Sequence, residues 1–74
     1  MVYNFSAEIV WDNDIGQYIG IVSCLPGAHS RAHTLEELNN NLEDVIKLCL
    51  AELTDEEKSA LPKFIGTHSI SFAA

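Results

Sequence analysis

Basic residues are scarce in this 74-residue chain, where four Lys and Arg stand against 11 Asp and Glu and give a formal net charge of -7. This balance opposes contact with a phosphate backbone, so we expect no direct nucleic-acid binding and a preference for a basic protein partner. The alternative to a basic partner is that the negative charge only keeps the protein soluble. The length leaves no room for a second domain, and residues 1–74 are predicted to form a single one.

Long apolar runs are also missing, and the amino-terminal residues carry no basic segment. The sequence therefore predicts neither a membrane span nor a signal peptide, and we expect a cytoplasmic protein. Cysteine is represented only by Cys24 and Cys49, which lie in apolar segments and indicate packed thiols more than a disulfide. Because so short a chain buries only about 60% of its unfolded surface, we expect a homo-oligomer, either a dimer or a tetramer.

Motifs for catalysis and metal binding are absent from the sequence. It has no CxxC pair, no HExxH helix, no glycine-rich phosphate loop and no nucleophile elbow. Asp12 and Asp14 resemble part of a calcium loop, but the residues after them lack the remaining ligands, and a hairpin turn explains them. Cys24, His29 and His33 do not have a standard zinc spacing. We therefore expect no enzyme activity, no cofactor and no metal.

Alternation of apolar and polar residues predicts short strands near both ends of the chain. Turn-forming residues at 12–16 and the corner Leu25-Pro26-Gly27 divide the first part, because Pro26 cannot donate to a sheet and Gly27 readily takes positive φ. The segment before this corner is apolar on both faces, as in an interior strand. The predicted strands cover residues 2–11, 17–24, 28–32 and 64–72.

A long amphipathic helix is predicted over 35–53, where apolar residues recur at spacings of three and four. Thr34 and Glu37 are placed for a reciprocal capping box at its start. A second short helical turn follows over 54–60. The sequence thus predicts an α+β fold with two layers in the order β-β-β-α-β, in which one helix covers one face of a small antiparallel sheet.

Such a fold leaves a sheet edge or face open, so we predict an oligomer interface that includes the aromatic residues Tyr3, Trp11 and Tyr18. A second contact site is predicted on the helix, where Leu48 lies outside the apolar stripe. A single surface leucine is ordinary, which is the competing interpretation. The predicted partner-binding residues are Glu36, Glu37, Asp44, Leu48 and Glu52.

The order of these elements resembles the HicB-type antitoxin family over nearly the whole chain. The resemblance is carried by a strand that ends in Leu25-Pro26-Gly27, by His29, by Thr34-Leu35-Glu36-Glu37-Leu38, and by a long helix. It implies a partial ribonuclease H-like fold without the catalytic carboxylates of that enzyme. Many members of the family carry a further C-terminal DNA-binding domain, and we expect none after Ala74.

The resemblance also implies a function, namely that the chain binds and silences a small basic HicA-like toxin that cleaves messenger RNA. An acidic antitoxin could occupy the RNA-binding surface of such a toxin without doing any chemistry. Some short members of the family have no obvious toxin. The alternative is therefore a stand-alone oligomeric module on the same fold that regulates or binds a small ligand.

Overall fold

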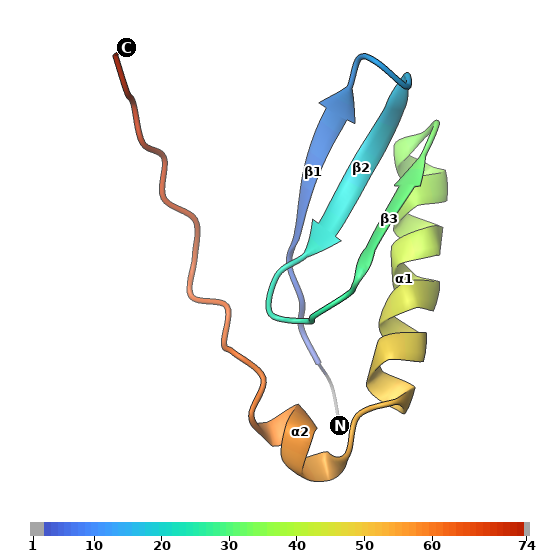
Figure 1. Ribbon diagram of the computed structural model, residues 1–74, viewed down its shortest axis with the longest axis vertical. Helices are drawn as coiled ribbons and strands as arrows, with labels where there is room; N and C mark the ends of the chain where they lie inside the picture. Colours follow the sequence, from blue (N-terminus) through green and yellow to red (C-terminus); the bar gives the residue numbers. More distant parts are fainter. Residues whose placement is uncertain (1–2, 74) are drawn as a thin grey trace.

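The computed structural model describes residues 3–73 and shows a small sheet with one long helix packed on it (Figure 1). The three strands pair antiparallel in the order β1-β2-β3, and α1 lies against β3 and β2. This arrangement confirms the predicted two-layer α+β class. The elements are β1 (Ala7–Asp12), β2 (Gln17–Val22), β3 (His29–Ala32), α1 (Leu35–Ala51) and α2 (Asp55–Ser59).

Local turn chemistry fixes the hairpin between β1 and β2. The Asp12 carboxylate accepts hydrogen bonds from the backbone N–H groups of Asp14 at 2.9 Å and Ile15 at 3.4 Å. Gly16 has φ of 65° and donates to the Asp12 carbonyl at 2.8 Å. An Asp that bonds its own turn and a glycine in the left-handed region are the features that a tight reversal requires. The prediction that Asp12 and Asp14 belong to a hairpin turn, and not to a calcium loop, is confirmed for Asp12.

The corner between β2 and β3 contains two residues in the left-handed region. Gly27 has φ of 80°, as its place after Pro26 predicts, and Cys24 has φ of 67°, which is uncommon for a residue with a side chain. Across the corner the Val22 N–H donates to the Ala28 carbonyl at 2.8 Å. The reversal at Cys24 explains why β2 ends at Val22, two residues before the predicted end.

The two helices begin at threonine caps, but only one of them forms the full capping box. Thr34 accepts from the Glu37 N–H at 3.1 Å, whereas the reciprocal bond predicted from the Glu37 carboxylate is not formed. At α2, Thr54 and Glu57 make both bonds, at 3.1 Å and 3.0 Å. One hydrogen bond is therefore sufficient to position the start of α1, which packs on the sheet along its length.

The core lies between α1 and the strands β2 and β3. Its fully buried centre is Leu38, and Gly20 on β2 allows this close approach, because a Cβ there would lie 2.8 Å from Leu42 Cδ1. Leu35, which the helical periodicity also places in the apolar stripe, is exposed. The buried residues are Val22, Leu25, Ala28, Ala32, Leu38 and Leu42.

Two predicted strands differ from the structure. The first starts at Ala7 and not at residue 2, and Val2 lies outside the described residues. The strand predicted over 64–72 is not formed, because this segment is an extended chain that pairs with none of β1, β2 or β3 (Figure 1). A strand needs a neighbouring backbone to satisfy its N–H and C=O groups, and among residues 3–73 this segment has none.

Candidate functional site

The solvent face of α1 carries an apolar residue between carboxylates. Leu48 is 68% exposed. Asp44 and Glu52 lie four residues before and after it, so both neighbour Leu48 on the helix surface. Glu37 falls on the same side of the helix, seven residues before Asp44, which is close to two full turns. We call Glu37, Asp44, Leu48 and Glu52 the acidic ridge.

Glu36, the remaining residue of the predicted contact site, belongs to a neighbouring row of the same helix. At about 100° per residue it shares a side with Glu43 and Lys47, and it lies about a quarter turn away from Glu37. All three residues of this row are exposed. The structure therefore brings four of the five predicted residues together and places Glu36 beside them.

A second surface lies on the sheet next to α1. Trp11 on β1 and Tyr18 on β2 are opposite each other in the strand register, and their rings meet edge to face with centroids 4.8 Å apart. Trp11 and Ile9 are each 50% exposed although both lie on the helix-covered side of the sheet. The reason is that α1 covers β2 and β3 and leaves β1 largely open. We call Ile9, Trp11 and Tyr18 the sheet patch.

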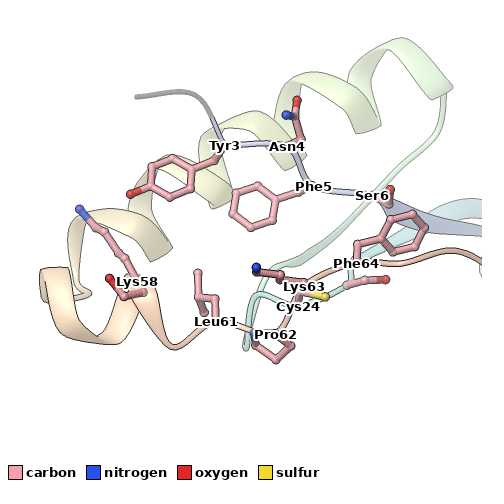
Figure 2. Close-up of a pocket in the computed structure, with 12 residues that line it drawn as sticks. Tyr3, Asn4, Phe5, Ser6, Cys24, Lys58, Leu61, Pro62, Lys63 and Phe64 are labelled. Carbon is pink, nitrogen blue, oxygen red and sulfur yellow. The ribbon is translucent and has the colours of Figure 1, made fainter.

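Tyr3 is separate from the sheet patch, so the predicted aromatic interface divides in two. Its ring stacks on Phe5 with centroids 6.2 Å apart, at the opposite end of β1 from Trp11. Figure 2 shows both aromatic residues on one side of an open cavity of about 480 Å³, which is lined on its other side by Lys58, Leu61 and neighbouring residues of the C-terminal segment.

The open face of the sheet, which the fold class predicts, is the side away from α1, and neither Trp11 nor Tyr18 lies on it. Val10 on β1 and Ile21 on β2 are exposed there, on the side away from α1. The signal for this open face was present in the sequence, because a strand that is apolar on both faces in a protein with one long helix must leave one of those faces uncovered.

Reactive groups in the described part of the chain are dispersed. Among residues 3–73 no three His, Cys, Asp or Glu side chains are grouped to hold a metal ion. Cys24 and Cys49 are both free and partly buried, and Cys49 packs against the core, as predicted for structural thiols. Hydrogen bonds with the Thr54 backbone and hydroxyl lower the pKa of Glu57, and these bonds belong to the α2 cap. No helix within residues 3–73 is both long enough and apolar enough to cross a bilayer.

Two proteins of known name are similar to this chain. A UPF0150 protein of Thermotoga maritima is 42% identical over 52 residues, which cover 70% of this chain and 69% of that protein. The UPF0150 protein ssr1258 of Synechocystis sp. is 40% identical over 66 residues, which cover 89% and 90%. No protein-family model and no solved structure matches the chain. At these identities and lengths, the chain belongs to the UPF0150 family.

Proposed function

We propose that this UPF0150 protein is a cytoplasmic antitoxin of the HicB type, which neutralises a small basic ribonuclease of the HicA type by protein binding. The observation that carries the proposal is the acidic ridge, where exposed Leu48 lies between Asp44 and Glu52 on a well-formed helix. A partly desolvated apolar contact with charged residues around it is typical of a protein-binding surface. The motif from Leu25 to Leu38 supports the choice of family.

The charge of the chain supports a basic partner. Carboxylates on the ridge would attract a cationic toxin and raise the association rate, while Leu48 would slow dissociation by burial at the centre of the contact. The toxin would be silenced because its RNA-binding surface is occupied. This mechanism requires no catalytic group from the antitoxin.

The test is co-expression with a HicA-type toxin, followed by an RNA-cleavage assay with the purified pair. The informative variant is D44K/E52K, and we expect it to lose toxin binding and protection. D14K/E43K makes the same charge change away from Leu48 and is the matched control. We expect the control to keep protection, with only a slower association. An equal loss of toxin binding by both variants would mean that binding depends on the net charge of the chain and not on the acidic ridge.

A second candidate function is a small-ligand module, and the cavity in Figure 2 is the observation that favours it. Two of the four basic residues of the chain, Lys58 and Lys63, line this cavity together with Ser6 and Ser59. Such a lining would suit a small anion. Titration with phosphate and with citrate, followed by NMR of both lysine side chains, tests this function. Saturable chemical-shift changes of both lysines, together with no binding of the chain to a toxin, would favour the small-ligand module over the antitoxin role.

A further inference from the structure

The C-terminal segment after α2 is an extended chain that pairs with no strand in the part of the molecule that the structure describes. We call residues 64–72 the tail. Ile70 and Phe72 are 82% and 86% exposed. In an extended chain, alternate residues share one face, so these two side chains lie together while Ser69 and Ser71 face the other way. Residues 69–72 therefore have one apolar face and one polar face, as a strand at the margin of a half-covered sheet requires.

The residues just before the tail are held against the rest of the domain. Leu61 packs against the core, and its N–H donates to the Lys58 carbonyl at 3.3 Å. Phe64 reaches the cavity beside Ser6, immediately before β1 begins (Figure 2). Pro62, between these points, has a fixed φ and no N–H, which stiffens the exit. Beyond Phe64 the tail runs past β1 without pairing to it (Figure 1).

The edge of β1 is the better of the two sheet edges for an added strand. β3 is only four residues long, and its Arg31 carbonyl already accepts from the Asn41 amide of α1 at 3.4 Å. β1 has six residues, about 20 Å of edge, which a nine-residue tail can cover completely. Ile9 and Trp11 are two residues apart on its helix side and half exposed, so they match the spacing of Ile70 and Phe72.

The overall dimensions indicate how much surface the chain leaves uncovered. Its radius of gyration is 14.2 Å, whereas about 11 Å is expected for a compact domain of this length. Its accessible surface is 6079 Å², against about 4,500 Å² for a compact protein of this mass. For one chain, this excess is about twice the roughly 800 Å² that each partner buries in a standard protein interface.

The distribution of charged residues favours a second copy of the chain as the occupant of the β1 edge. All 11 acidic residues lie at or before Glu57, whereas Lys58 and Lys63 are the only charged residues after it. Two copies with a net charge of -7 repel each other, so they can associate only where the carboxylates are few. The tail itself contains no Asp, Glu, Lys or Arg, so contact between the uncharged tail of one copy and the apolar side chains of Ile9 and Trp11 on another meets this condition.

We propose that two copies of this chain exchange tails, so that residues 64–72 of each copy form a fourth strand on the β1 edge of the other. Ile70 and Phe72 then cover Ile9 and Trp11 beside α1, and the serines face solvent. Reciprocal exchange of an identical segment closes with two-fold symmetry and leaves neither tail unpaired. The inference does not depend on the antitoxin role, because its test uses the purified chain alone.

The first experiment measures the oligomeric state by sedimentation velocity over a range of concentrations. We expect a dimer for the native chain. The variant I70S/F72S loses two apolar side chains per tail and four per dimer, so its dimer dissociation constant should rise by more than about 1,000-fold. S69N/S71N alters the opposite face of the same segment and should change that constant by less than about threefold. A native monomer, or equal dimers of all three proteins, would overturn the proposal.

The second experiment uses the native sequence and distinguishes exchange from folding back. Dimers of one isotopically labelled and one unlabelled chain allow NMR contacts between chains to be observed selectively. We expect contacts of Ile70 and Phe72 with Ile9 and Trp11 in the filtered spectrum, that is, between chains. The same contacts found only within one chain would show that the tail closes on its own β1, and would refute the exchange. A tail that contacts β1 only after a foreign protein is added would refute it as well.

Discussion

Gly20 allows the sharpest test of how α1 packs on the sheet. A Cβ at this position would lie 2.8 Å from Leu42 Cδ1 and 3.3 Å from the nearest Leu38 methyl. Carbon atoms in contact are usually about 3.5–4.0 Å apart, so the Leu42 methyl must move by roughly 0.7 Å or more. Both leucines are buried, and therefore have little room to adjust. We expect G20A to destabilise the domain.

The magnitude follows from two opposing contributions. Overpacking a core typically costs about 1–3 kcal/mol. Replacing a strand glycine by alanine returns roughly 0.5–1 kcal/mol through lower chain entropy in the unfolded state. The net loss in free energy of unfolding is about 1–2 kcal/mol, which for a domain of this size corresponds to a melting temperature lower by roughly 4–16 °C. Thermal unfolding followed by circular dichroism at fixed protein concentration measures this shift.

Two further variants separate the close contact from a general effect of alanine. A Cβ at Gly66 meets nothing within 4 Å, so G66A should stay within about 0.5 kcal/mol of the native chain. L42V removes the atom that a Cβ at Gly20 would meet. The double variant G20A/L42V should therefore be more stable than the sum of the single changes by at least about 0.5 kcal/mol. Strict additivity, or a G20A protein as stable as the native one, would refute the proposed contact.

The remaining predictions concern the core and the α2 cap. L38A should lower the free energy of unfolding by about 2–5 kcal/mol because Leu38 is fully buried, whereas L48A should change it by less than about 0.5 kcal/mol. Denaturant titrations measure both values, and a similar loss for the two variants would contradict the assigned burial. Hydrogen bonds from Thr54 lower the pKa of Glu57 in the folded state, so the cap is fully stabilising above the ordinary glutamate pKa and weakens as the pH falls through the lowered value. The protection factor of the Thr54 amide, which corrects its exchange for the intrinsic rate at each pH, should fall on acidification, and E57Q should remove that pH dependence.

Features set by neighbouring residues could be predicted from the sequence. Asp12 and Gly16 form the hairpin turn, Gly27 takes positive φ after Pro26, and Thr34 caps the long helix. Each depends on atoms within four residues of one another, so residue type and order are sufficient. The exposure of Leu48 could also be predicted, because its place on the helix follows from the period of the helix itself.

Features set by tertiary packing could not be predicted in the same way. Periodicity places Leu35 in the apolar stripe, but its exposure depends on where the helix sits over the sheet. Alternation shows that 64–72 is an amphipathic extended segment, but it does not identify the backbone that would pair with it. The sheet patch also depends on tertiary packing, because Trp11 is exposed where α1 covers β2 and β3 but not β1.

The two proposed surfaces impose different requirements, and the chain separates them along its sequence. A surface that attracts a cationic toxin must be acidic, whereas a surface that joins two identical acidic chains must avoid that charge. The carboxylates of the ridge are on α1, and the tail carries none. Exchange of tails would therefore leave both ridges of a dimer free. Two ridges on one particle would bind a partner that presents two sites more tightly than a single ridge could, without any new contact.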